Sequence, residues 1–171
     1  MKLFQFKKTL AFILSLCMLI SMFAVVSVSA VNNFSLKANS NLSISVNGTD
    51  KIICGISEST TVAELLVNFE NSESITVCKN DVVLDEDKKV GTGTSVVFDD
   101  DIAYVVIEGD TDGNGRIDST DYLRLKSALL SQITLEGAYY LAADADKDGS
   151  LSSSDYLRLK SHFLGDFNLY E

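Results

Sequence analysis

Two acidic segments of the chain place oxygen-bearing side chains at a spacing that suits a hard metal ion. The first is DTDGNGRIDSTD at residues 110–121, and the second is DADKDGSLSSSD at residues 144–155. Side-chain oxygens stand at loop positions 1, 3, 5, 9 and 12 in both segments, and position 6 is Gly115 or Gly149. Calcium takes about six to eight oxygen ligands, which a loop supplies when alternate side chains point inward and a glycine makes the sharp bend. The spacing therefore predicts two Ca²⁺ sites.

The ligands of each site are predicted from their loop positions. Position 7 contributes its backbone carbonyl, and position 9 acts directly or through a water. At position 12 both loops carry Asp where EF-hand loops usually carry a bidentate Glu, so the following helix should lie closer to the ion. Two loops in the same register also argue against a merely solvated acidic run. The predicted ligands are Asp110, Asp112, Asn114, Arg116, Asp118 and Asp121 in the first loop, and Asp144, Asp146, Asp148, Ser150, Ser152 and Asp155 in the second.

Each loop runs into a predicted helix, and the two helices have nearly the same sequence. STDYLRLKS begins at Ser119 and SSDYLRLKS begins at Ser153. Asp118 or Ser152 is a plausible N-cap, which puts the aspartate of position 12 in the first turn and links ion binding to helix initiation. Helical spacing predicts a buried stripe between the helices. Its members are Tyr122, Leu125 and Leu129 with Tyr156, Leu159 and Phe163, joined by Ile117 and Leu151 from the loops.

The opposite face of both helices is a mixed patch of leucines, hydroxyls and a lysine, which is typical of a protein-binding surface. On one helix alone it would indicate a solvated face with two stray leucines. The duplication favours a partner, because folding constrains the buried stripe and the ligands more than the residues outside them. The patch consists of Ser119, Thr120, Leu123, Lys126, Ser127 and Leu130, matched by Ser153, Ser154, Leu157, Lys160, Ser161 and Leu164.

The paired D-x-[DN]-x-[DN]-G loops, each closed by Asp and followed by a helix, resemble a type I dockerin over residues 109–165. Serine-threonine or serine-serine at loop positions 10 and 11 belongs to the same resemblance. It implies an all-α, EF-hand-like module that binds two Ca²⁺ and docks onto a cohesin of a scaffoldin in a cellulosome or similar extracellular polysaccharide-degrading complex. Carried over by position, the resemblance implies that the candidate cohesin contacts are Ser119, Thr120, Lys126 and Ser127, with Ser153, Ser154, Lys160 and Ser161. Leu123 and Leu157 of the mixed patch complete the predicted partner-binding residues.

The near symmetry of the two helices resembles dockerins that bind in two orientations related by a half-turn. Many dockerins carry a second basic residue where this chain has Ser127 and Ser161. Which cohesin is the partner therefore stays open. A free-standing calcium sensor is a competing hypothesis. It predicts that calcium exposes apolar surface rather than ordering the module.

Residues 31–108 are predicted to form a small α+β domain. LSISV and KIICGI read as a hairpin with a tight turn at Asn47-Gly48, and TVAELLVNF reads as an amphipathic helix that starts with a Thr61–Glu64 capping box. Four β-prone runs follow, SITVCK, VVL, TSVVF and IAYVVIE. The last run meets the first acidic loop without a linker, so the two halves should be closely coupled. The predicted fold class is thus a small α+β domain followed by an all-α dockerin.

The first half shows no catalytic motif, and we expect it to be a non-catalytic accessory domain. It has no Ser/His/Asp set, zinc motif or phosphate loop, and the sole histidine, His162, lies outside it. Whether it is a spacer, a carbohydrate-binding module or a protein-interaction module stays open. A small hydrolase delivered by its dockerin is the alternative, although no two of its candidate acids stand out as a pair. These acids are Glu58, Glu64, Glu70, Glu73 and Asp99 to Asp101.

The start of the chain predicts secretion. MKLFQFKK supplies a basic segment, Leu10 to Val28 an apolar run and VSA a cleavage pattern, so residues 1–30 read as a signal peptide, with a retained anchor as the alternative. We expect a secreted, extracellular protein without stable membrane insertion after cleavage. Without residues 1–30, 11 basic residues remain against 24 acidic ones, so the net charge changes from −10 to −13, which argues against nucleic acid and anionic membranes as partners. Cys54 and Cys78 could form a disulfide or remain free, and residues 166–171 read as a C-terminal tail.

Overall fold

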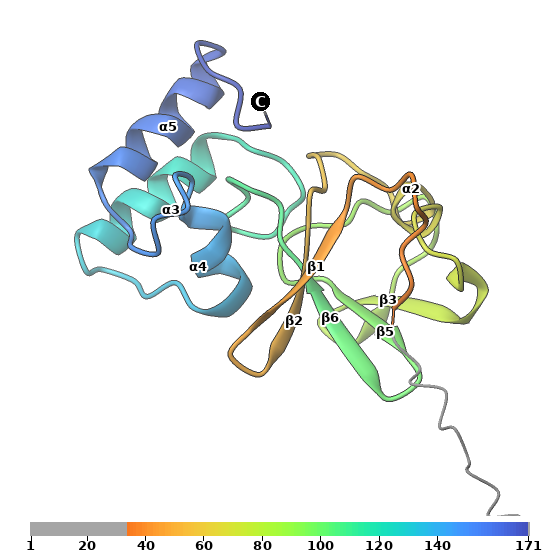
Figure 1. Ribbon diagram of the computed structural model, residues 1–171. Coiled ribbons are helices and arrows are strands. Elements are labelled where there is room, and N and C mark those ends of the chain that lie inside the picture. Colours follow the sequence, from red (N-terminus) through yellow and green to blue (C-terminus); the bar gives the residue numbers. More distant parts are fainter. Residues whose placement is uncertain (1–33, 171) are drawn as a thin grey trace, which may run out of the picture. The chain divides into compact units, whose positions relative to one another are not determined.

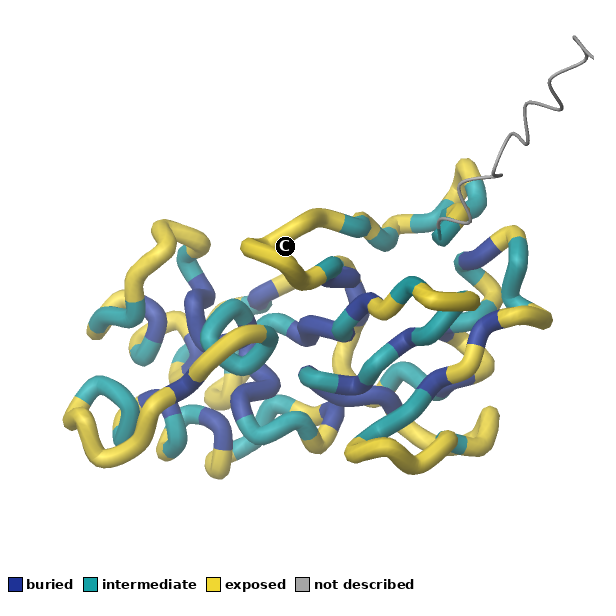
Figure 2. The backbone as a smooth tube through the Cα atoms, turned by 90° about the horizontal axis from the view of Figure 1, so that it is seen from below, coloured by how far each residue is buried: buried dark blue, intermediate teal, exposed yellow. Residues whose placement is uncertain are grey.

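The computed structural model describes residues 34–170, which belong to one compact unit (Figure 1). The predicted signal peptide at residues 1–30 lies outside the described residues. Strands make up most of the first part of this unit, and helices make up the second. Buried positions gather inside both parts, while exposed positions lie on the turns and on the outer faces of strands and helices (Figure 2).

A six-stranded mixed sheet forms the first part. The strand order is β1-β2-β6-β5-β3-β4. Neighbouring strands run antiparallel except β2 and β6, which pair in parallel through Lys51↔Ala103, Ile52↔Tyr104 and Ile53↔Val105. The strands are β1 (Ser43–Asn47), β2 (Asp50–Cys54), β3 (Ile75–Lys79), β4 (Val82–Val83), β5 (Ser95–Phe98) and β6 (Asp101–Val105).

The prediction of a small α+β domain is wrong, because the region is a sheet domain. Its α-helix, α2 (Val62–Leu66), has only five residues, beside a 3-10 turn at Ser72–Ser74. The expected capping box of Thr61 and Glu64 is present, but the amide of Asn68 donates to the carbonyls of Glu64 and Leu65 and ends the helix there. The apolar spacing therefore predicts which residues are buried, Val62, Leu65 and Phe69, but not that the helix ends after five residues.

The core of the sheet domain takes side chains from α2 and from the strands. Val62, Leu65 and Phe69 are buried against Val96 and Val105. Phe34 packs on Phe69 with a ring-centroid distance of 6.1 Å. The apolar residues predicted for the helix therefore pack against one face of the sheet.

The hairpin of β1 and β2 is present, but its turn lies one residue later than predicted. Asn47 pairs with Asp50, so Gly48 and Thr49 are the central residues. Gly48 has φ +63°, and a positive φ at the first central residue is the requirement of a type II′ hairpin turn. The glycine, rather than the Asn-Gly pair, sets the register.

The sheet order also decides the question of a disulfide. Cys54 lies on β2 and Cys78 on β3, and β6 and β5 lie between these strands. Three strand spacings place the two cysteines roughly 14 Å apart, beyond the Cα separation that a disulfide can bridge. Both cysteines are free thiols.

The second part is helical, as expected. It consists of α3 (Ser119–Leu129), α4 (Gly137–Ala143) and α5 (Ser153–Leu164). Its core includes the fully buried Leu125 and Leu159, with Ile117 and Leu151 packed against them. None of the helices within residues 34–170 has the length and apolar character needed to cross a membrane.

Two features of the helical part differ from the sequence analysis. The short helix α4 was not predicted; it packs Ala142 against Ile52 and Val106. Phe163, assigned to the buried stripe, is 44% exposed and stacks on Tyr122 at a ring-centroid distance of 6.0 Å.

The last residues of the chain return to the fold. Leu169 is buried in the helical core, and the hydroxyl of Tyr170 accepts a hydrogen bond from the backbone N–H of Glu58 at 3.2 Å. Leu169 and Leu159 lie so close to Gly109 that a Cβ there would be 2.9 Å from a methyl group of each. The C-terminal segment thus covers the junction between the last strand and the first loop.

Two leucines of α5 provide a matched test of the helical core. Leu159 is fully buried and Leu157 is 57% exposed. We expect Leu159→Ala to lower the free energy of unfolding by about 3 kcal/mol, because it leaves a cavity, and Leu157→Ala by about 0.5 kcal/mol or less. Urea unfolding of both variants measures the difference. Equal losses would contradict the assigned burial of α5.

Candidate metal centres and partner-binding face

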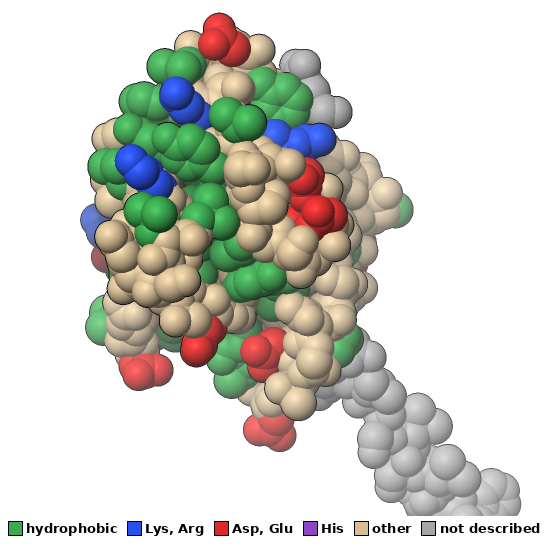
Figure 3. Space-filling model, turned by 90° about the vertical axis from the view of Figure 1, so that its left-hand side faces the viewer, with side chains coloured by type: hydrophobic (Ala, Val, Ile, Leu, Met, Phe, Trp, Pro, Cys, Tyr) green, Lys and Arg blue, Asp and Glu red, His purple; other side chains and the backbone are tan. Residues whose placement is uncertain are grey.

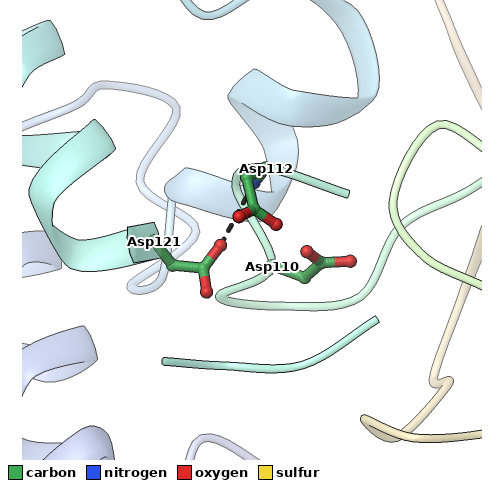
Figure 4. Close-up of side chains that lie close together, drawn as sticks. All are labelled: Asp110, Asp112 and Asp121. Carbon is green, nitrogen blue, oxygen red and sulfur yellow. Dashed lines mark hydrogen bonds between the residues drawn. The ribbon is translucent and has the colours of Figure 1, made fainter. Parts of the chain in front are cut away.

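The first acidic loop gathers three carboxylates. Oxygens of Asp110, Asp112 and Asp121 all lie within 4.8 Å of one another (Figure 4). Asp110 and Asp121 are fully buried, and Asp112 is half-buried. Three carboxylates at this separation repel one another in a partly dehydrated site unless a cation lies among them.

Backbone N–H groups fix the orientation of these carboxylates. Asp121 Oδ1 accepts from the N–H groups of Thr111 and Asp112, and the second of these bonds is drawn in Figure 4. Asp121 Oδ2 accepts from the N–H of Asp118, which closes the capping box at the start of α3. The residue that closes the loop therefore also starts the helix, as predicted.

The second loop repeats the cluster with Asp144, Asp146 and Asp155, whose oxygens also lie within 4.8 Å of one another. Asp155 Oδ1 accepts from the N–H of Asp146, and Asp155 Oδ2 accepts from the N–H of Ser152 at the start of α5. Asp144 Oδ1 is buried and has no hydrogen-bond partner among the described residues.

A buried carboxylate oxygen without a partner is costly, and a cation would satisfy it. The donors of both clusters are hard oxygens, which Ca²⁺ prefers. The residues present therefore fit calcium. The main support for this assignment is the buried Oδ1 of Asp144, which has no hydrogen-bond partner among the described residues.

The other predicted ligands lie at the rims of the two clusters. Asn114 Oδ1 accepts from the N–H of Arg116, and Asp148 Oδ1 accepts from the N–H of Ser150. At position 9 the side chains of Asp118 and Ser152 cap their helices by accepting from the N–H groups of Thr120 and Ser154. The clusters thus bring together positions 1, 3 and 12.

Burial perturbs the titration of the first loop. It raises the pKa of Asp121 to about 6, helped by the charges of Asp112 and Asp110 and opposed by the N–H groups of Asp118 and Asp112. The pKa of Asp110 is also raised by burial, although the N–H groups of Thr92, Gly115 and Gly113 oppose the change. Protons and a metal ion should therefore compete for this cluster.

The helices α3 and α5 lie side by side and present the predicted partner face. Tyr122 and Tyr156 meet with a ring-centroid distance of 5.8 Å. Leu123 and Leu157 are 48% and 57% exposed. Figure 3 shows hydrophobic side chains next to lysine or arginine side chains on this side of the protein. Also exposed are Ser119, Thr120, Lys126, Leu130, Ser153, Ser154, Lys160 and Leu164, whereas Ser127 and Ser161 are half-buried.

Residues 108–164 match a family model described as the dockerin type I domain. The comparisons with curated proteins and with solved structures gave no match. Dockerin domains bind calcium and dock onto cohesins, which agrees with the two acidic clusters and with the exposed face of α3 and α5.

Acid should weaken calcium binding by the first loop. Because the pKa of Asp121 is raised to about 6, calcium must displace a proton from this carboxyl below that pH. We expect the affinity to rise between about pH 5 and 7 and then to level off. Titration calorimetry in buffers of different ionisation enthalpy measures the affinity and the protons released.

In the calcium-free protein the same raised pKa of Asp121 makes stability fall, rather than calcium affinity rise, as the pH increases. A raised carboxyl pKa means that the folded state holds its proton more tightly than the unfolded state, so this contribution to stability is lost as the pH rises from about 4 to about 6. The measurement is the difference in free energy of unfolding, in chelator, between the wild type and Asp121→Asn. A difference that stays constant over this interval would contradict the assignment.

Proposed function

We propose that this protein docks, through α3 and α5 of its calcium-loaded dockerin domain, onto a cohesin of a scaffoldin in a cellulosome-type complex. The observation that carries the proposal is the duplicated exposed face. Each helix begins with two exposed hydroxyl residues, continues with an exposed leucine and reaches an exposed lysine one turn further on. Leucines in such polar surroundings are typical of a protein interface.

Two calcium ions are part of the proposal, one in each loop. Bound calcium would supply the positive charge that three neighbouring carboxylates require. Asp121 and Asp155 hold the first turns of α3 and α5 through the N–H groups of Asp118 and Ser152. The same turns carry Ser119, Thr120, Ser153 and Ser154. Ordering a loop therefore orders the docking residues next to it.

We further propose that either helix can make the main contact, so that docking has two orientations. The support is the matching exposure of equivalent residues on α3 and α5. A half-turn that exchanges the helices would present the cohesin with an almost identical set of side chains. One altered helix should then leave the other able to bind.

The sheet domain is proposed to be a non-catalytic accessory domain of a secreted protein, with residues 1–30 as the signal peptide. Several of its candidate catalytic acids have structural partners. Glu64 belongs to the capping box of α2, Glu58 accepts from the N–H of Ile117, and Asp101 pairs with Lys51. Glycoside hydrolysis needs two carboxyls at a suitable separation across one cleft, whereas these three carboxyls are engaged in contacts that hold the fold.

Changes on both helices should abolish cohesin binding. Ser119→Asp with Thr120→Asp adds charge and bulk to one docking site, and Ser153→Asp with Ser154→Asp does the same to the other. We expect each pair alone to change the affinity by less than about threefold, and all four together to weaken it more than about 100-fold. A pull-down on a panel of cohesins, followed by calorimetry with the best binder, measures this.

The matched control is Ser43→Asp with Ser45→Asp, two exposed serines on β1. This pair should bind like the wild type, and chelator should remove binding for every protein. If no cohesin binds in calcium, docking is refuted. A single altered helix that abolishes binding would refute the two orientations and leave docking intact.

The accessory role predicts that the purified protein hydrolyses no polysaccharide or ester. The assay is a panel of plant polysaccharides and aryl esters, with reducing ends and released phenol as readouts. Activity that survives repurification and is lost on replacing an acid of the sheet domain would favour the small hydrolase instead.

A further inference from the structure

The two acidic loops are repeats in sequence, yet their surroundings differ. Each loop carries four aspartates, so the number of carboxylates favours neither as a calcium site. The sheet domain contacts the first loop through several backbone groups, whereas the second loop meets it through an ion pair of Lys147 with Glu108 at 2.8 Å.

Position 1 shows the first difference. Asp110 Oδ2 and Asp144 Oδ2 each accept from the N–H of the position 6 glycine, Gly115 or Gly149, at 3.0 Å. Asp110 Oδ2 accepts a further hydrogen bond, from the N–H of Thr92 at 2.8 Å. The first ligand of the first loop is thus anchored from outside its own loop.

Thr92 is itself held firmly. It is fully buried, and its hydroxyl donates to the carbonyl of Ile107 at 3.2 Å and accepts from the N–H of the same residue at 3.1 Å. The ammonium of Lys79 donates to the carbonyl of Thr92 at 2.5 Å. The N–H that reaches Asp110 therefore belongs to a rigid part of the sheet domain.

Position 6 shows the second difference. A Cβ on Gly115 would lie 2.3 Å from the carbonyl oxygen of Val90, whereas a Cβ on Gly149 would meet nothing within 4 Å. The carbonyl of Gly115 also accepts from the N–H of Ser59 at 2.7 Å. The first loop therefore lies directly on backbone of the sheet domain at its bend.

At position 4 the two loops differ in sequence, and the difference reflects the same contact between the first loop and the sheet-domain backbone. The residue is Gly113 in the first loop and Lys147 in the second. A Cβ on Gly113 would lie 2.6 Å from the carbonyl oxygen of Thr92, and a Cβ on Gly91 would lie 2.2 Å from the carbonyl oxygen of Gly113. Only glycines permit this approach of two backbones.

Position 8 adds a side-chain contact. The N–H of Ile117 donates to Glu58 Oε2 at 3.1 Å. Glu58 also donates its own N–H to the hydroxyl of Tyr170 in the C-terminal segment. Contacts with the sheet domain thus run from position 1 to position 8 of the first loop.

We propose that Glu58, Ser59 and the segment Val90–Thr92 are positioning residues of the first calcium loop, and that this loop therefore binds calcium more tightly than the second. The proposal rests on the proposed calcium binding of the dockerin domain. A loop already held in place loses less conformational freedom when the ion binds. By linkage, calcium in this loop also stabilises the sheet domain.

The test separates the two sites in the full chain. One background disables the second loop with Asp144→Ala and Asp146→Ala, and the other disables the first with Asp110→Ala and Asp112→Ala. We expect calorimetry to show at least about tenfold tighter calcium binding when the first loop is intact. Equal affinities in the two backgrounds would overturn the proposal.

Gly91→Ala tests the positioning itself, because its Cβ would meet the carbonyl of Gly113. We expect the calcium affinity of the first loop to fall about tenfold or more and that of the second to change less than about twofold. Gly48→Ala, whose Cβ would meet nothing within 4 Å but whose φ of +63° strains an alanine in the turn between β1 and β2, is the control for general destabilisation and should change neither affinity. Equal effects of Gly91→Ala on both loops, or no effect on the first, would contradict the proposal.

If the Gly91→Ala variant does not fold, two further measurements still test the proposal. Glu58→Ala should weaken calcium binding by the first loop about threefold to tenfold, and Glu70→Ala, at an exposed position, should not. Calcium should also slow hydrogen exchange of the Ser59 and Thr92 amides when the first loop is intact. Unchanged affinity or exchange would count against the proposal, whereas the absence of calcium binding in both backgrounds would refute the proposed function as well.

Discussion

Repulsion among three neighbouring carboxylates is the constraint on which the helical part depends. In each loop the oxygens of three aspartates lie within 4.8 Å of one another, and two of the three aspartates are buried. The third member of each set, Asp121 or Asp155, also closes the capping box of α3 or α5. The carboxylate that joins each cluster therefore also starts the helix, so the first turn of the exposed face is coupled to the geometry of the cluster.

Much of this site is local, which is why the sequence predicts it. Loop positions 1, 3 and 12 converge because the spacing of a calcium loop is a property of one short segment. The caps at Asp118 and Ser152 follow from residue type and position alone. The buried Leu125 and Leu159 follow from helical periodicity, while Phe163 lies too near the end of α5 for its neighbours to cover it.

Non-local pairing explains what the sequence does not predict. The apolar spacing of TVAELLVNF is satisfied by five helical residues and a turn, because the sheet buries Val62, Leu65 and Phe69 however the backbone continues. Strand order is equally absent from local patterns, so the separation of Cys54 and Cys78 emerges only from the sheet. The missing linker predicts that the two parts are coupled, but the individual contacts of the first loop with the sheet domain are non-local, and Gly113, where the second loop has Lys147, marks one of them in the sequence.

The sheet domain contacts the first loop directly, so no flexible linker separates it from the helical part. A flexible linker would let the domain sample a wide volume around its attachment point. Here the hydrogen bonds of Thr92 and Ser59 to the loop fix the direction in which the sheet domain projects from α3 and α5. In the two docking orientations proposed above, a half-turn would therefore point the sheet domain in two different directions from the same docking site, so the choice of orientation would decide where the sheet domain lies.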